Sequence, residues 1–214
     1  MIAKSQEFND NTCENTDLCF DCLLYKTNED FEFRGKKICS GCEKELNELA
    51  KKKGVIFIEK ERNEPSYSGW YQGLTDHTDV YAIVGNREIF LKGYVQEKGH
   101  DTETGKADIF KLKRQFLLSN FNYICFYNSG ESKDPLKFIK NIKKIEDNFG
   151  DNYNCELRKK EGEEFYYFHG NLERVSCAFS FRIFNKEYYE EIVETLKDPY
   201  FKNIKIGEKN GTRK

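Results

Sequence analysis

Two pairs of cysteines near the start of the chain most constrain what it can fold into. Cys19 and Cys22 form one Cys-x2-Cys pair, and Cys39 and Cys42 form a second pair after sixteen intervening residues. Two thiolates on one tight turn can both reach a single metal ion, and two such turns complete a tetrahedron of sulfur ligands. The spacing is that of a four-cysteine zinc site. The sequence therefore predicts one structural Zn²⁺ with no open coordination position for catalysis.

The residues after the second pair have the pattern of a helix. Acidic side chains lead and lysines trail between Glu43 and Lys53, which complements the helix dipole, and Gly54 ends the segment. A knuckle, a hairpin near residues 31–36 and a second knuckle that opens a helix follow the order of a treble-clef finger. Over residues 17–45 the chain resembles the zinc-binding part of recombination endonuclease VII and related HNH-associated proteins. It lacks the His and Asn series that follows the second pair in those nucleases, so the resemblance implies no catalytic role there.

The composition indicates a folded protein, and eight cysteines in a chain without the pattern of a secretory leader indicate a reducing compartment. Charged residues make up 34% of the chain, but 18 Phe and 13 Tyr supply large apolar surfaces for a core. The formal net charge of −2 gives no general attraction to nucleic acid, so any such contact has to come from a local patch. No segment has the pattern of a secretory leader or a membrane span, so we expect a cytoplasmic protein without a membrane partner.

The middle of the chain, residues 55–150, has the pattern of strands followed by a helix and another strand. A glycine-asparagine pair at 85–86 lies between two apolar runs, which predicts a hairpin. Residues 63–73 are rich in loop-forming types. The expected elements are strands at 55–58, 79–84 and 88–95, a helix at 106–118 and a strand at 122–127.

This layout looks like the core of PD-(D/E)XK nucleases. In that family an Asp and an acid two residues before a Lys hold Mg²⁺, and the Lys positions the attacking water. The matching residues are Asp79 and Lys92, but Phe90 stands at the position of the acid; Glu88, four residues before Lys92, is the displaced candidate on the same strand face. A single carboxylate binds Mg²⁺ poorly. The resemblance therefore implies either a Mg²⁺-dependent nuclease acting on DNA or an inactive nuclease-like core. The alternative is that Asp79 caps a turn and that Lys92 is a solvated residue on a strand.

Two helical segments supply the best local candidates for contacts with DNA or RNA phosphates. The alternative for each is an ordinary solvated helix face. The candidate residues are Lys111, Lys113 and Arg114 on the first segment and Lys137, Lys140 and Lys144 on the second.

The last third, residues 151–214, alternates aromatic strands with a helix that Asn185 is expected to cap. From residue 122 onward the order is strand, helix, two or three strands, helix, strand. That order also suits a ferredoxin-like sandwich, so the middle and last thirds can share one sheet. The aromatic residues either fill the core or form a surface for a protein partner or a homodimer.

These patterns predict an α+β protein. The expected parts are a treble-clef-like zinc finger at residues 1–54, an α/β nuclease-like core at 55–150 and an α+β portion at 151–214. The function that we expect is non-catalytic: a zinc-binding accessory protein that docks a protein or nucleoprotein partner, for example one that modulates a CRISPR-type effector in phage defence or counter-defence. The alternative is the Mg²⁺-dependent nuclease with Asp79, Glu88 and Lys92 at its centre.

Overall fold

The computed structural model describes residues 38, 40–68, 71–96, 102–128, 132–149, 153–159, 162–172, 177–201 and 204–207. They contain helices and runs of consecutive antiparallel strands, which confirms the predicted α+β class. The chain divides into two compact units, Met1–Leu117 and Leu118–Lys214. The zinc finger predicted at residues 1–54 lies largely outside the described residues.

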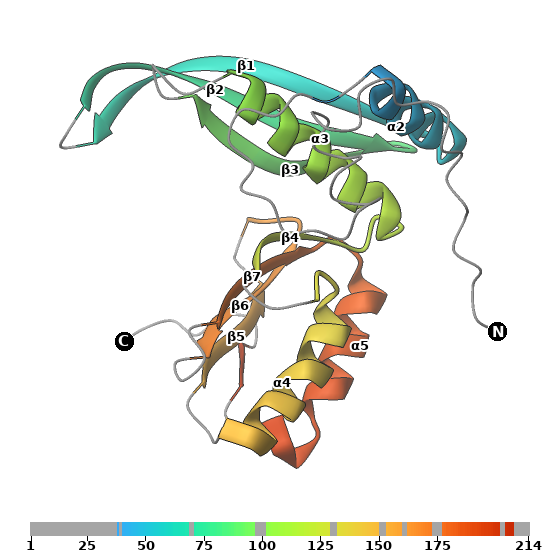
Figure 1. Cartoon of the computed structure of the whole chain (residues 1–214), viewed down its shortest axis with the longest axis vertical. Coiled ribbons are helices and arrows are strands. Elements are labelled where there is room, and N and C mark those ends of the chain that lie inside the picture. The colour runs from blue at the N-terminus through green and yellow to red at the C-terminus, as the bar shows by residue number, and fades with distance from the viewer. Residues whose placement is uncertain are drawn as a thin grey trace. The chain divides into compact units, whose positions relative to one another are not determined.

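The first unit is built on a three-stranded antiparallel meander in the order β1-β2-β3. Helix α3 lies along one face of this sheet, and α2 leads into its first strand (Figure 1). The described elements are α2 (Ser40–Lys52), β1 (Val55–Ser68), β2 (Tyr71–Val84), β3 (Arg87–Gln96) and α3 (Thr102–Leu118).

Helix α2 forms where the sequence predicts a helix after the second cysteine pair. Its buried residues Cys42, Leu46 and Ala50 are spaced four apart, so they lie on one side of the helix. At its end the N–H of Lys53 donates to the carbonyl of Leu49, and Gly54 has a φ of +66°. A glycine accepts this left-handed conformation without a steric penalty, which explains the sharp end of the helix.

The hairpin of β1 and β2 is longer than the sequence indicates. Their ladder runs from the pair Val55–Val84 to the pair Ser68–Tyr71, whereas β3 pairs with β2 only from Asp76 onward. The hairpin therefore extends past β3 as a two-stranded ribbon (Figure 1). The loop expected at residues 63–73 is wrong for residues 63–68 and 71–73, which are strand. A ladder held by main-chain hydrogen bonds at a sheet edge tolerates polar residues and proline.

Helix α3 packs its apolar side on the sheet. The rings of Phe57 on β1 and Phe116 on α3 meet edge to face with their centroids 6.4 Å apart. The hydroxyl of Tyr94 on β3 donates to the main-chain carbonyl of Asp108 on α3 at 3.2 Å. We call the side of the sheet that carries α3 the inner face and the opposite side the outer face.

The second unit is a five-stranded sheet with two helices on one face. The strand order is β4-β7-β6-β5-β8, and β8 runs parallel to β5 while the other neighbours are antiparallel. Its elements are β4 (Tyr123–Asn128), α4 (Pro135–Phe149), β5 (Tyr153–Lys159), β6 (Tyr166–Leu172), β7 (Cys177–Ile183), α5 (Lys186–Leu196), the 3-10 turn η2 (Pro199–Phe201) and β8 (Lys205–Gly207). The predicted order is confirmed with three middle strands, one more than the β-α-β-β-α-β order of a ferredoxin-like sandwich.

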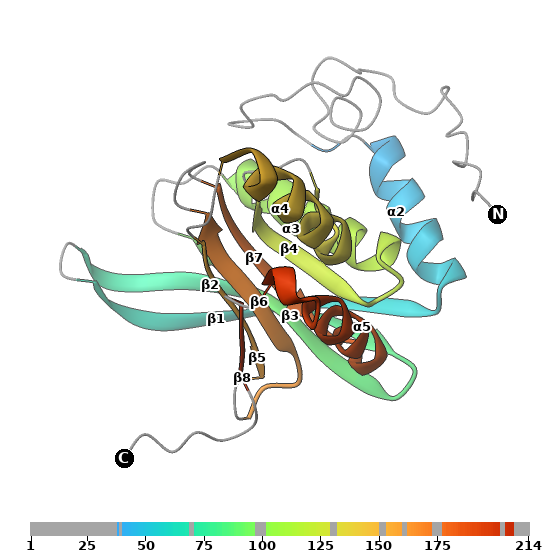
Figure 2. The same cartoon turned by 90° about the horizontal axis from the view of Figure 1, so that it is seen from below.

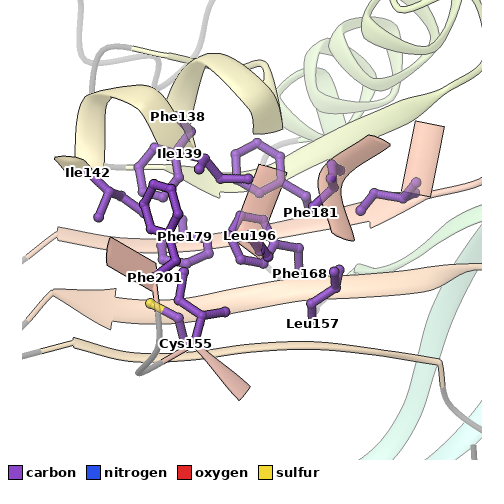
Figure 3. Close-up of a cluster of buried hydrophobic side chains, with 13 residues drawn as sticks. Phe138, Ile139, Ile142, Cys155, Leu157, Phe168, Phe179, Phe181, Leu196 and Phe201 are labelled. Atoms are coloured by element: carbon purple, nitrogen blue, oxygen red, sulfur yellow. The ribbon is translucent and has the colours of Figure 1, made fainter. Parts of the chain in front are cut away.

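The core of the second unit is filled by rings. Helices α4 and α5 lie side by side over the sheet (Figures 1 and 2). Phe138 of α4 meets Phe179 and Phe181 of β7 with centroids 4.4 and 5.8 Å apart, and Figure 3 shows these rings interleaved with Phe168 of β6. Most phenylalanines of the last third thus fill the core, as the first of the two alternatives predicts.

The structure divides the chain between Leu117 and Leu118, so the part expected at residues 55–150 is split, and its last strand and helix share a sheet with the last third, which is the alternative that the sequence left open. Strand β4 pairs with β7, where Tyr123 lies opposite Ile183, and α4 covers the same sheet. The strand that follows α3 therefore belongs to the five-stranded sheet rather than to the meander. Residues 55–150 do not form one unit, because the apolar side of α4 is buried against strands from the last third.

Candidate functional site

The nuclease-like residues fall on the meander of the first unit, but the structure does not bring all three together. In the ladder of β2 and β3, Glu88 lies opposite Ile83, Lys92 opposite Val80 and Asp79 opposite Gly93. The register shifts between Val80 and Tyr81, so β3 carries one extra residue there.

This β-bulge decides which side chains share a face. Ile83 and Asp79 are four residues apart on β2, so their partners Glu88 and Gly93 lie on one face together with Asp79. Val80 is three residues from Ile83, so its partner Lys92 lies on the opposite face. The prediction that Glu88 and Lys92 share a face is therefore wrong, because simple alternation does not allow for the inserted residue.

Asp79 lies on the outer face and is bound to an arginine. Nε of Arg62 on β1 donates to Oδ2 of Asp79 at 2.7 Å, and the Asp79 residue is only 8% exposed. A β-carbon at Gly93 would stand 2.6 Å from Oδ1 of Asp79. The absence of a side chain at Gly93 is what makes room for the carboxylate.

Glu88 is the second carboxylate of the outer face, and it also has a basic partner. Nζ of Lys60 donates to Oε1 of Glu88 at 2.7 Å and lies 4.2 Å from the centre of the Tyr81 ring. The hydrogen bond from Lys60 to Glu88 raises the pKa of Lys60. Lys60 is also the direct neighbour of Asp79 across the β1–β2 ladder. Two carboxylates and two cations thus form a charge-balanced group on this face.

Lys92 is on the inner face, next to an aromatic ring. Its ammonium lies 4.4 Å from the centre of the Tyr94 ring, a cation–π contact. The Tyr94 hydroxyl reaches α3, and burial raises the pKa of Tyr94. Lys92 therefore stands beside α3, across the sheet from Asp79 and Glu88.

Within the parts of the chain that the structure describes, no three His, Cys, Asp or Glu side chains come together as a metal-binding group. Cys42 is buried in the first turn of α2, where the predicted second knuckle opens its helix. Cys19, Cys22 and Cys39 lie outside the described residues, so the four-cysteine site stays a prediction.

The basic residues of α3 do not form an exposed row. Arg114 is buried, with 6% of its surface exposed. Nζ of Lys113 lies 2.5 Å from Oε1 of Glu59 on β1 and 5.5 Å from the centre of the Phe57 ring. Lys111 is half-buried. Two of the three residues proposed for phosphate contacts on this helix, Lys113 and Arg114, thus pack within the first unit.

The ion pair of Lys113 and Glu59 stands at a pocket of 380 Å³ between α2, β1 and α3. Its lining combines apolar side chains from α2 and α3 with the acids Glu43 and Glu59. The lining residues are Ile38, Glu43, Leu46, Asn47, Glu59, Ile109, Phe110 and Lys113.

The basic residues of α4 differ from those of α3. Lys137, Lys140 and Lys144 are all exposed, and their spacing of three and four residues places them in one row along the helix. This row is on the solvent side of α4, opposite Phe138 and Ile142, which are buried in the core. Of the predicted basic residues, these three alone form an exposed set in the described chain.

Sequence reasoning missed Arg62 and Lys60, the partners of the two carboxylates. Both lie in or beside a segment that has no strand pattern, and neither is near its partner in sequence. One signal was available: an isolated glycine within a strand, here Gly93, often marks the close approach of another group.

No protein-family model matches the chain, and no curated protein or solved structure is significantly similar to it. Among the described helices, none has the length and apolar character needed to cross a membrane.

Proposed function

We propose that the chain is a non-catalytic binding protein that docks onto a protein or nucleoprotein partner. The observation that carries this proposal is the position of Asp79, which is bound to Arg62 on the outer face while Lys92 lies on the inner face. A nuclease of the PD-(D/E)XK type needs its acids and its lysine around one metal ion and one water. The register of β2 and β3 favours a structural role for these residues instead.

The ion pairs support the same proposal. A carboxylate that binds Mg²⁺ has to offer its oxygens to the ion. In this sheet the Asp79 carboxylate accepts from Arg62 and the Glu88 carboxylate accepts from Lys60, both at 2.7 Å. Metal binding would therefore have to displace two cations from their partners.

The predicted zinc finger is the part of the chain that we assign to partner docking. A four-thiolate site organises a small module and supplies folding energy without catalysis. Cys42 lies in the first turn of α2, whose exposed side carries both acids and lysines, so the finger and this helix would present one polar surface. A role beside a CRISPR-type effector belongs to this proposal as one possible setting.

Affinity capture tests the proposed function. The full chain carries a tag and is recovered from its native host, with nucleic acid either digested or left intact. We expect a partner that Cys42→Ser loses and that the matched control Cys125→Ser keeps, because only Cys42 belongs to the predicted zinc set. A wild-type chain that retains no partner in either arm would contradict the proposal.

A further inference from the structure

The five-stranded sheet has a second face, which we call the open face, on the side away from α4 and α5. Side chains alternate along a strand, so the neighbours of the core residues Leu157, Phe168 and Phe181 lie on it. The register places one residue of each strand in a single row across the sheet. In spatial order the row is Tyr127 (β4), Ser180 (β7), His169 (β6), Glu156 (β5) and Lys205 (β8).

The row is accessible to a ligand. Tyr127 is 57% exposed, although it is a large aromatic residue on a strand. The side chain of His169 is 38% exposed, and that of Arg158, which lies two residues from Glu156, is 48% exposed. Neighbouring strands are about 4.8 Å apart, so the row from Tyr127 to Lys205 spans about 19 Å.

The charges of the open face favour an anion. Arg158 and Lys205 are its exposed permanent cations, and Glu156 is the one carboxylate among its described strand residues. Nε2 of His169 and Nε of Arg158 lie 3.6 and 3.7 Å from Oε2 of Glu156. Among these strand residues the two permanent cations outnumber the one acid, while Glu163, outside the strands, lies close enough to Arg182 to act on its charge.

The surface beside the row is closely packed. The guanidinium of Arg182 lies 4.6 Å from the centre of the Phe126 ring and 4.4 Å from that of Phe165. Tyr167 packs edge to face on Phe165 at 4.9 Å. Burial lowers the pKa of Arg182. The exposed row therefore stands beside a packed layer of rings that holds the strands in place.

We infer that the open face is a binding platform for single-stranded nucleic acid. Bases stack on the rings of Tyr127 and His169, and Arg158 and Lys205 contact the phosphates. Sheets that bind single strands combine these two features, because every base has a face that can stack and every nucleotide carries a negative charge. The centre of a protein–protein interface is instead depleted of charged residues, whereas this row ends in the charged residues Glu156 and Lys205, with Arg158 beside them.

This inference deepens the proposed function, on which it rests, by naming the chemistry of the partner. It also places the nucleic-acid contact on the open face instead of on the basic residues of α3 and α4. The lysine row of α4 lies on the helical side of the same unit, so a charge reversal there is a matched control. Lys140 is exposed on α4 and Arg158 is exposed on the open face, and each can be changed to Glu without touching the core.

Fluorescence anisotropy with the full chain tests the platform. The probes are labelled oligo-dT and oligo-U, with the corresponding duplexes as competitors, at low salt. We expect single strands to bind better than duplexes, and Tyr127→Ala to weaken binding at least about fivefold while Tyr127→Phe retains it. Arg158→Glu should weaken binding and lower the slope of log affinity against log salt by about 0.7, the share of one phosphate contact. Lys140→Glu should bind like the wild type.

Three results would overturn the platform: no binding of either single strand, equal binding by Tyr127→Ala and the wild type, or loss of binding in Lys140→Glu but not in Arg158→Glu. Circular dichroism of each variant shows whether the fold is kept, and Tyr127→Phe gives a second reading of the same position. If the oligonucleotides do not bind but a partner is still captured from the host, the platform is refuted and the proposed function stands. Failure of the capture refutes the proposed function.

Discussion

Arg62 and Asp79 are joined across the outer face of the meander, with Nε of the arginine 2.7 Å from Oδ2 of the aspartate. The Asp79 side chain is 11% exposed and the Arg62 side chain is 43% exposed, so the carboxylate is the buried partner of the pair. A buried carboxylate that lost its donor would have little water to replace it. This contact ties strand β1 to strand β2 and occupies the residue that a nuclease would use for its metal.

Arg62→Ala should therefore lower the free energy of unfolding by about 1–3 kcal/mol, because it leaves a buried acceptor unsatisfied. Lys60→Ala on the same face is the matched control and should change stability little, since both side chains of the Lys60–Glu88 pair are about half exposed. Urea denaturation of the two variants measures the difference. An equal loss of unfolding free energy in the two variants would contradict the claim that burial of Asp79 makes its ion pair the more important one.

Gly93→Ala should destabilise the first unit by about 1–3 kcal/mol, because its new methyl group would overlap the Asp79 carboxylate. The cost should fall when the same change is made in an Asp79→Ala background, where the oxygen is gone. A double-mutant cycle by urea denaturation gives this coupling. If the stability losses of Gly93→Ala and Asp79→Ala simply add in the double mutant, the close approach of Asp79 to Gly93 is contradicted.

The stability of the second unit should fall in alkali. Burial, and then the neighbouring Asp134 carboxylate, raise the pKa of Tyr123, whose hydroxyl donates to Oδ2 of Asp134 at 2.9 Å. A raised pKa in the folded state gives stability that is complete below the unfolded pKa of about 10 and is lost as the pH rises above it. Burial also raises the pKa of Tyr188.

Tyr123→Phe should remove part of this alkaline loss. Between about pH 8 and pH 11 we expect its unfolding free energy to fall less than that of the wild type by about 1 kcal/mol, after allowance for partial exposure of the ring. Tyr127→Phe is the control, because that ring is exposed. Urea denaturation at the two pH values measures both, and parallel pH profiles for Tyr123→Phe and the wild type would refute the assignment.

Metal analysis of the purified chain should give about one zinc per molecule, as the two cysteine pairs predict. Cys42→Ser should lower the zinc content, whereas Cys125→Ser should not. A strong chelator should lower the thermal midpoint of the wild type, because metal binding and folding are coupled in such modules. A native protein without zinc would refute the finger.

Much of the fold follows from local sequence signals. The sequence predicts that Asn185 caps a helix, and its side chain accepts a hydrogen bond from the N–H of Tyr188 at 2.8 Å at the start of α5. The pair Gly85-Asn86 marks the turn between β2 and β3, where Gly85 has a φ of +60°. These elements depend on a few neighbouring residues, so a single sequence contains their determinants.

The candidate site depends on longer-range features that the sequence pattern does not carry. One inserted residue in β3 moves Lys92 to the face opposite Asp79, and period-two alternation cannot reveal such a bulge. The partner of Asp79 is Arg62 on β1, between the expected strand at residues 55–58 and the stretch at 63–73 whose composition indicates a loop. The allocation of β4 to the second sheet likewise depends on pairing with β7, more than fifty residues later in the chain.

A cleavage assay tests the central claim most directly, namely that Asp79 and Lys92 serve structure rather than catalysis. The full chain is incubated with plasmid and with single-stranded DNA in Mg²⁺ or Mn²⁺, beside Asp79→Asn and Lys92→Ala. We predict no cleavage by the wild type or by either variant. Cleavage by the wild type that is lost in both variants would contradict the account and establish the nuclease.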